Sequence, residues 1–188
     1  MNFMGYRRPD GKAGIRNKVL ILPTCVCSSE TCRIVADQVE GAIYTSNQAG
    51  CSEVEQNLKI CYDMYSGFAA NPNIYGTVLI GLGCEGCTPD KMADAIREKT
   101  NKPLAVVVIQ DEGGTVNAIN KAVKYAREFV QEASLVQKEE IPLSELFIGL
   151  ECGGSDATSG LAANPVVGKV SDLVVDNGGS AVMSETTE

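Results

Sequence analysis

The chain has 188 residues, of which 44% are hydrophobic, and its formal net charge at pH 7 is -8. This length and apolar content suffice for one good core, or for one domain and the start of another. The longest apolar runs are strand length, far below the roughly 20 residues of a membrane-spanning helix, so we expect no membrane span. The acidic balance and the scattered basic residues argue against a nucleic-acid partner.

The amino terminus lacks both the apolar stretch of a secretory signal and the pattern of a transit peptide, so we expect a cytoplasmic protein. Eight cysteines is a high count, but the chain is too large and too regularly patterned for a disulfide-stapled secreted module. Buried thiols or metal ligands are the remaining interpretations. Histidine is absent, which removes the commonest neutral metal ligand and the usual general base near neutral pH.

From about residue 17 onward, short runs of Val, Ile and Leu alternate with segments whose apolar residues recur at spacings of three and four. This alternation predicts βαβ units and therefore an α/β fold, with a Rossmann-like parallel sheet of about four strands flanked by helices. The expected strands cover about 18–23, 41–45, 76–82 and 104–109, and the expected helices about 28–39, 52–69, 89–99 and 115–134.

A domain edge is predicted after Val136, where the sequence turns polar before Pro142. Residues 1–138 are therefore expected to form the α/β domain, and residues 139–188 the start of a second α/β unit. The second unit is predicted to hold a strand at 146–150, a glycine-rich loop, a helix at 165–177 and a strand at 180–184. Two strands and one helix bury little surface, so we expect the natural polypeptide to continue or these elements to dock onto the first domain.

Two helix starts are marked by a capping residue followed by proline, at Thr88-Pro89 and at Asn164-Pro165. The polar side chain is expected to take the N-cap position, and the proline the first helical position, where its missing N–H costs nothing.

Four loops stand out because each follows a predicted strand, and together they carry six of the eight cysteines. Open α/β sheets gather their ligands at the carboxyl ends of their strands. Thiols at helix N-termini have lowered pKa values, and thiolates select iron, zinc or iron-sulfur clusters. The metal-ligand candidates, one from each loop, are Cys27, Cys51, Cys84 and Cys152. For each of them the competing interpretation is an ordinary buried thiol that packs as a small apolar group.

A single CxxC pair, Cys84-Glu-Gly-Cys87, also fits a dithiol redox site. A structural zinc site would need a second such pair, so structural zinc is disfavoured.

The loop Glu151-Cys-Gly-Gly-Ser-Asp156 places two glycines beside a thiol and two carboxylates. Such a loop lets backbone amides approach a ligand carboxylate closely. Glu151 and Asp156 are the candidate catalytic carboxylates, and Ser155 is a candidate substrate contact. The competing interpretation is a plain glycine turn with a Ser or Asp cap.

Three stretches together resemble the altronate/galactarate dehydratase family, of the altronate hydrolase large-domain type: residues 5–17, 149–165 and 184–188. Weaker similarity at 22–27, 50–51, 81–85 and 110–115 extends the resemblance over nearly the whole chain. The resemblance implies a hydro-lyase that removes water from a sugar acid such as D-altronate or galactarate to give a 2-keto-3-deoxy acid. It also implies ferrous iron, with Mn²⁺ or another divalent metal as substitute.

The resemblance further implies that residues 139–188 begin a C-terminal catalytic domain, and that the chain is a fragment of the full enzyme. Arg8, Arg16 and Asn17 are the expected contacts to the substrate anion, since an arginine offers a bidentate fork to a carboxylate. An ordinary exposed terminus is the competing interpretation. The expected partners are a small subunit like the family's N-terminal domain and further copies of the chain in a homo-oligomer.

Sulfolactate sulfo-lyase, whose large subunit is similar to the same family, eliminates sulfite instead of water and gives a second candidate activity. A non-catalytic scaffold domain and a dithiol redox protein are the two remaining hypotheses for the function of the chain. The chain departs from the family where Ser46-Asn-Gln-Ala49 stands in place of a segment that often holds a histidine. This departure leaves the metal ligands and the substrate open.

Overall fold

The computed structural model describes residues 1–185 and divides into two compact units. Tyr6–Gln137 forms the first, termed the sheet unit, and Met1–Gly5 together with Lys138–Glu188 forms the second, termed the C-terminal unit. The division falls at the polar segment that the sequence marks as a domain edge, except that the first five residues group with the C-terminal unit. No helix within residues 1–185 is both long and apolar enough to cross a membrane.

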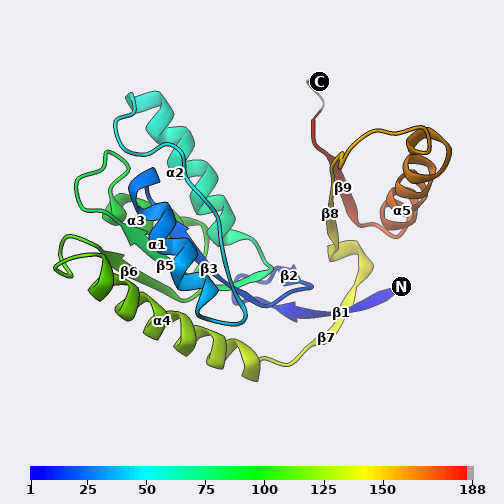
Figure 1. Ribbon diagram of the computed structural model, residues 1–188. Helices are drawn as coiled ribbons and strands as arrows, with labels where there is room; N and C mark the ends of the chain where they lie inside the picture. Colours follow the sequence, from blue (N-terminus) through cyan, green and yellow to red (C-terminus); the bar gives the residue numbers. More distant parts are fainter. Residues whose placement is uncertain (186–188) are drawn as a thin grey trace. The chain divides into compact units, whose positions relative to one another are not determined.

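The sheet unit is built on four parallel strands in the order β4-β3-β5-β6 (Figure 1). The strands are β3 (Lys18–Pro23), β4 (Ala42–Tyr44), β5 (Ile74–Gly81) and β6 (Leu104–Val108). All eight residues of β5 except Tyr75 are buried, as expected for a parallel strand that is covered on both faces. The predicted α/β fold with about four parallel strands is confirmed.

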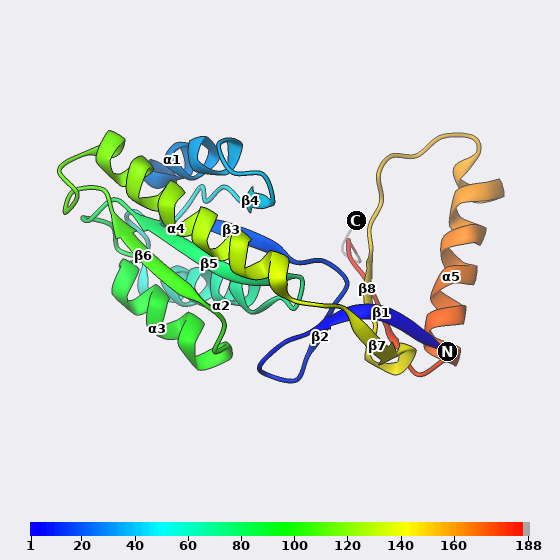
Figure 2. The same ribbon diagram turned by 90° about the horizontal axis from the view of Figure 1, so that it is seen from below.

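Two helices cover each face of this sheet (Figure 2). On one face lie α1 (Val26–Asp37) and α4 (Thr115–Leu135), and on the other lie α2 (Glu55–Ala70) and α3 (Pro89–Lys99). Each face has its own apolar core, with Ile21, Val78 and Ile80 pointing to the first and Leu22 and Leu79 to the second. The four predicted helices are therefore confirmed, with ends shifted by a few residues.

Three short strands lie outside the predicted set. The first half of β1 (Asn2–Arg7) pairs antiparallel with β7 (Glu139–Pro142), and its second half pairs with β2 (Ala13–Gly14). These strands are too short or too polar to show the alternation by which a half-buried strand is recognised.

The C-terminal unit holds two parallel strands, β8 (Phe147–Leu150) and β9 (Ser180–Met183). Between them in sequence lie a π-helix, η2 (Ser159–Ala163), and α5 (Asn164–Asp176), while a 3-10 turn, η1 (Leu143–Glu145), precedes β8. The prediction that Asn164 caps α5 is wrong, because η2 leads directly into the helix and Ala163 takes the cap position. At α3 the predicted order holds, with Thr88 as N-cap and Pro89 as the first helical residue, although the Thr88 side chain makes no capping hydrogen bond.

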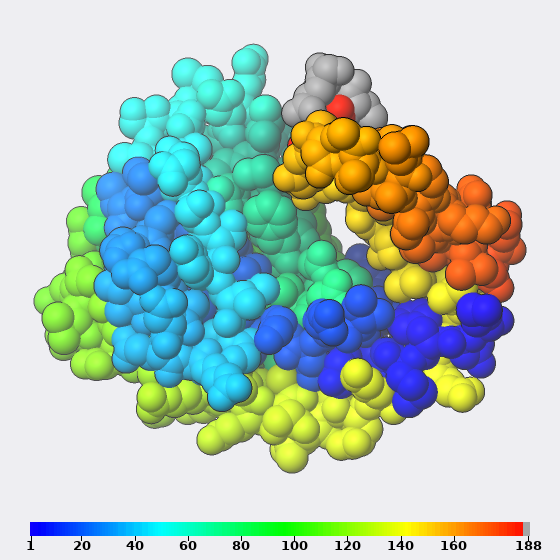
Figure 3. Space-filling view, turned by 45° about the vertical axis from the view of Figure 1, so that its right-hand side comes forward, coloured from blue at the N-terminus to red at the C-terminus, as the bar shows by residue number. Residues whose placement is uncertain are grey.

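Apolar side chains of the C-terminal unit are largely exposed. Leu161 is 85% exposed, Phe147 65% and Val166 62%, and Val174 is the single buried residue of α5. In the space-filling view, the atoms of α5, shown in orange, lie on the outer surface (Figure 3). The described part of this unit therefore does not cover its own apolar surface.

Candidate functional site

The cysteine loops of the sheet unit meet where the direction of the chain connections reverses. The neighbouring strands β3 and β5 are followed by α1 and α3, which lie on opposite faces of the sheet. A reversal of this kind is the topological switch point at which open α/β sheets bind ligands. The loop after β3 carries Cys25 and Cys27, and the loop after β5 carries Cys84 and Cys87.

Three thiols interact at this edge. The exposed thiol of Cys27 lies near the buried thiol of Cys25 and the exposed thiol of Cys51, close enough for both to affect its pKa. The pKa of Cys27 is raised, first by the neighbouring Cys25, then by partial burial and by Cys51. The expected lowering of the Cys27 pKa at a helix N-terminus is therefore not found. Cys25 is absent from the predicted site residues, although its position two residues before Cys27 is a visible signal.

Backbone hydrogen bonds hold the cysteine loops together. The Val26 N–H donates to the Ala49 carbonyl at 3.2 Å, and the Cys87 N–H donates to the Gly50 carbonyl at 2.8 Å. Gly50 has φ +88°, and a Cβ there would lie 2.2 Å from the Thr24 carbonyl oxygen. Only glycine permits this close approach, which brings Cys51 to the edge.

A buried polar network underlies the same three loops and was missed by the sequence reasoning. It consists of Thr24 (0% exposed), Asn47 (1%) and Glu85 (5%). Glu85 accepts hydrogen bonds from the Thr24 hydroxyl at 2.5 Å and from the Leu82 N–H at 2.8 Å. Burial alone would raise the pKa of the Glu85 carboxyl, but these hydrogen bonds outweigh it and the pKa is lowered. The ionised carboxylate of Glu85 therefore matches the donors that surround it.

The two cysteines of the CxxC pair differ in exposure. Cys84 is exposed, whereas Cys87 is buried in the core under α2 and α3. Burial, and next the neighbouring Cys61, raise the pKa of Cys87. All eight cysteines are free. A redox role for this pair stays a prediction.

Of the four predicted metal ligands, Cys27, Cys51 and Cys84 lie in the sheet unit and Cys152 lies in the C-terminal unit. Within residues 1–185, no group of three or more Cys, Asp or Glu side chains is arranged to hold a metal ion. Thiolates suit iron by chemistry, but the donors that the structure describes do not make a complete site. The metal role of these four cysteines stays a prediction.

Arg8 and Asn17 lie away from the thiols, at the amino-terminal end of the sheet. The Arg8 guanidinium is buried and donates to the Pro72 carbonyl at 2.6 Å, to Asn17 Oδ1 at 2.7 Å and to the Arg16 carbonyl at 2.8 Å. Asn17 in turn donates to the Ala133 carbonyl at 2.6 Å. These bonds tie the segment before β3 to the rest of the unit, so a structural role accounts for both residues. Arg16 is exposed. Anion binding by these three residues stays a prediction.

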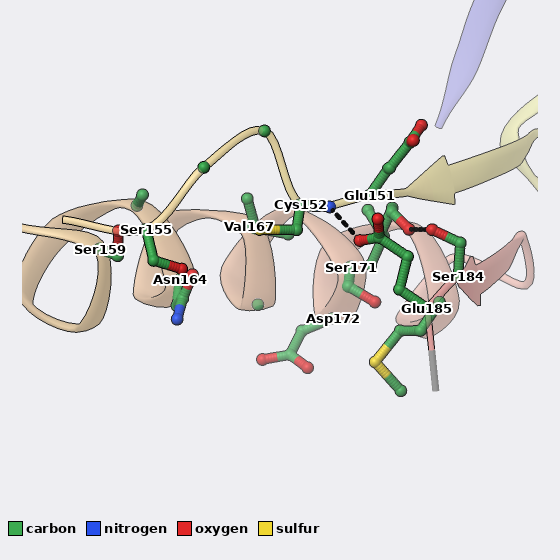
Figure 4. A pocket seen from close by; sticks show the side chains of 16 residues that line it. Glu151, Cys152, Ser155, Ser159, Asn164, Val167, Ser171, Asp172, Ser184 and Glu185 are labelled. Atoms are coloured by element: carbon green, nitrogen blue, oxygen red, sulfur yellow. Dashed lines mark hydrogen bonds between the residues drawn. The ribbon is translucent and has the colours of Figure 1, made fainter. Parts of the chain in front are cut away.

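The C-terminal unit has a cavity of its own, of about 600 Å³, bordered by the predicted glycine-rich loop (Figure 4). Glu151, Cys152 and Ser155 line it from the loop, and Asp172 lines it from α5. Glu185, which follows β9, lies beside this loop and accepts a hydrogen bond from the Cys152 N–H at 2.9 Å. Glu185 belongs to the motif predicted at 184–188, whose last three residues lie outside the described part of the chain.

The carboxylate of Asp156 is bound within a turn, whereas Glu151 lines the cavity. Its Oδ1 accepts hydrogen bonds from the Thr158 N–H at 2.7 Å and from the Thr158 hydroxyl at 2.6 Å, and it is not among the cavity-lining residues. These bonds, first the one from the Thr158 side chain, lower the pKa of Asp156. Asp156 therefore caps the turn before η2, as the interpretation of a capped glycine turn expects.

Comparison with known proteins identifies the family to which the chain belongs. Residues 5–134 match the family description "D-galactarate dehydratase/Altronate hydrolase, second domain", and residues 143–188 match "D-galactarate/Altronate dehydratase, C-terminal". The chain belongs to this family. The two matches lie on either side of the polar segment at which the structure divides, so each unit corresponds to one family domain.

Three relatives illustrate the range of the family. The (2R)-sulfolactate sulfo-lyase subunit beta of Chromohalobacter salexigens is 37% identical over 99% of this chain and 47% of its own length. The altronate dehydratase of Bacillus subtilis and the galactarate dehydratase (L-threo-forming) of Escherichia coli are each 31% identical, over 99% of this chain and 39% of their own length. The chain thus spans less than half the length of the curated relatives it matches.

Proposed function

We propose that this chain provides two regions of a hydroxy-acid lyase that removes water from a sugar acid, such as D-altronate or galactarate, to give a 2-keto-3-deoxy acid. The observation that carries the proposal is the family match, which covers both units in order. Lyase activity is common to the relatives named above. A scaffold or a redox protein would leave the cavity of the C-terminal unit without a role.

The reaction requires a base near the carbon next to the substrate carboxylate, and the geometry favours Glu151 over Asp156. Glu151 lines the cavity, whereas Asp156 is occupied by the turn at Thr158. A general base must reach the proton that it abstracts, so position decides before pKa does. Ser155 lines the same cavity, which supports the proposal that its hydroxyl donates a hydrogen bond to a substrate hydroxyl or carboxylate.

Among the described residues that line this cavity, an anionic substrate would face the carboxylates of Glu151, Asp172 and Glu185 and no Lys or Arg side chain. Binding therefore needs a cation from another source. A divalent ion, when bound, would neutralise the developing enediolate and assist departure of hydroxide. The described residues do not form a complete metal site, so no step of the reaction is assigned to a particular ligand.

Elimination of sulfite from sulfolactate is a second candidate activity, favoured by the 37% identity to a sulfo-lyase subunit. That relative is named as a beta subunit, which supports the expectation of a separate small subunit. Both reactions begin with proton loss next to a carboxylate, and they differ in the group that leaves.

The test is an anaerobic assay of the natural gene product, and of the 188-residue chain beside it, with altronate, galactarate and sulfolactate and with added ferrous iron. Formation of a 2-keto-3-deoxy acid supports the dehydratase, and sulfite release supports the sulfo-lyase. Glu151→Gln should lower turnover by about 100-fold or more, the scale of a lost general base, while Glu98→Gln, on the exposed side of α3, should leave it unchanged. Inactivity of both proteins on all three acids would refute the lyase proposal.

A further inference from the structure

We infer that Glu85 is a positioning residue: its buried carboxylate fixes the loops that carry Cys25, Cys27, Cys84 and Cys87 at the edge of the sheet. The inference rests on the proposed function only in the reason why these thiols matter. The geometry stands by itself, and neither the family match nor the predicted metal set assigns Glu85 a role.

The Glu85 side chain turns back toward its own loop and reaches the loop after the neighbouring strand. Oε1 accepts from the Thr24 hydroxyl at 2.5 Å and from the Leu82 N–H at 2.8 Å, and Oε2 accepts from the Gly83 N–H at 2.6 Å. Three donors therefore face a group that can only accept when ionised. Hydrogen bonds to a charged acceptor are shorter and stronger than neutral ones.

The space for this carboxylate exists because residue 81 has no side chain. A Cβ at Gly81 would lie 2.6 Å from Glu85 Oε1, 3.2 Å from Thr24 Oγ1 and 2.3 Å from Pro89 Cγ. The end of β5 is thus shaped around the carboxylate. If the Glu85 side chain pointed to the solvent, its carboxylate would not require a glycine at residue 81.

A third loop is joined through Asn47. Its Nδ2 donates to the Thr24 carbonyl at 2.9 Å, and its Oδ1 accepts from the Ala49 N–H at 2.9 Å. Thr24 therefore links Glu85 on one side to Asn47 on the other, and all three side chains are buried. The segment leading to Cys51 is held by the same network as the two loops at the switch point.

Two buried thiols lie within two residues of the network and report on it. Cys25 follows Thr24, Cys87 comes two residues after Glu85, and both are 0% exposed. Cys32, also 0% exposed, lies on α1 in the core of the face opposite to that of Cys87, and it serves as the control for unfolding of the whole unit. Exchange of one acceptor oxygen for an NH₂ group in Glu85→Gln would place a donor against a donor and release a loop.

The experiment measures the alkylation rate of each cysteine by peptide mass spectrometry on the native chain, without added metal, so that it does not depend on turnover. In Glu85→Gln we expect Cys25 and Cys87 to react about tenfold faster or more, as loss of a charge-assisted bond allows local opening. Cys32 should stay far less reactive than Cys25 and Cys87, because it is exposed only when the whole unit unfolds, and the urea midpoint should fall modestly, by the stability lost with the bond. Thr24→Val, which removes the hydroxyl, should raise the two rates in the same way. Thr24→Ser, which keeps the hydroxyl, and Glu98→Gln should both react like the unaltered chain.

Unchanged rates at Cys25 and Cys87 in both Glu85→Gln and Thr24→Val would overturn the inference. So would reaction of Cys25 and Cys87 at the same rate as Cys32 in both variants, because these thiols would then be exposed only by unfolding of the whole unit and not by release of the loops. The lyase proposal survives either of these results, and its own failure in the turnover assay would leave the labelling pattern intact.

Discussion

Both units contain parallel strands and helices, but they differ in how fully the helices cover the faces of the strands. In the sheet unit, helices lie on both faces of the parallel strands, and Leu79 in β5 is fully buried. In the C-terminal unit, two parallel strands have a single helix, and Leu161 and Phe147 are mostly exposed. Parallel sheets are stable when both faces are covered. We therefore expect the loops of the sheet unit to be held more rigidly than the loop of the C-terminal unit.

The largest expected difference between the units is in their response to removal of a leucine. Leu79→Ala leaves a cavity in a closed core and should lower the free energy of unfolding by about 2–5 kcal/mol. Leu161→Ala removes an 85% exposed side chain and should change it by less than about 0.5 kcal/mol. Urea unfolding followed by far-UV circular dichroism measures both. Equal losses would contradict the contrast between the units.

The amino-terminal network gives the next effect in size. Arg8→Lys keeps the charge but loses the fork that reaches three carbonyl or amide oxygens, and we expect a loss of about 1.5–3 kcal/mol in stability. Arg16→Lys, at an exposed position, should leave stability unchanged. If instead Arg8→Lys unfolds like the unaltered chain and lowers only substrate affinity, the anion-contact prediction is favoured over the structural role.

A somewhat smaller effect is expected from adding a methyl group at the end of a strand. Gly81→Ala forces a Cβ toward Pro89 and Glu85 and should destabilise the sheet unit by about 1–3 kcal/mol. Gly149→Ala, in β8, meets no atom within 4 Å and should be nearly neutral. The same urea measurement distinguishes them, and a neutral Gly81→Ala would show that the edge is not tightly packed.

The smallest effect concerns pH. Burial, and next the nearby Arg8, lower the pKa of Lys102 to about 8, and its Nζ donates to the Asn71 carbonyl at 2.6 Å. Because the unfolded lysine keeps its proton up to about pH 10.4, the unfolded state binds more protons above pH 8, and stability should rise with pH there.

Urea midpoints of the unaltered chain and of Lys102→Met, measured between about pH 7 and 9, isolate this effect, because the thiols of Cys32 and Cys87 contribute equally to both. Burial raises the pKa of both thiols, so their contribution to stability falls as pH rises above the unfolded thiol pKa. Lys102→Met should flatten the rise, whereas Lys91→Met, at an exposed position of α3, should retain it. The same slope in Lys102→Met as in the unaltered chain would contradict the assignment to Lys102.

The sheet of the first unit could be predicted because β3, β5 and β6 are nearly continuous apolar runs of strand length that alternate with helical patterns, which is typical of a parallel sheet flanked by helices. The short strands β2 and β7 could not be predicted, since two to four residues hold no periodic signal. Asn164 was misplaced as a cap because the turn before it continues as a π-helix, which has no sequence signature of comparable strength.

For the site, the loops that carry Cys27, Cys51 and Cys84 lie at one edge of the sheet, as expected for loops that follow parallel strands, and metal binding by these cysteines stays a prediction. The buried network could not be foreseen, because Thr24, Asn47 and Glu85 lie far apart in sequence and look like ordinary loop residues. Arg8 is the converse case, in which the structure shows a role that the sequence did not indicate, while its predicted anion contact stays a prediction. A motif arginine suggested a ligand contact, while the fold uses its donors for backbone carbonyls of the chain itself.

Native-state hydrogen exchange, resolved by peptide, tests the contrast between the units most directly. The account predicts that amides of β3 and β5 exchange only through global unfolding, and that those of β8, β9 and α5 exchange far faster through local opening. Equal protection of β5 and β8 in the isolated chain would contradict it, because the C-terminal unit would then be as complete as the sheet unit.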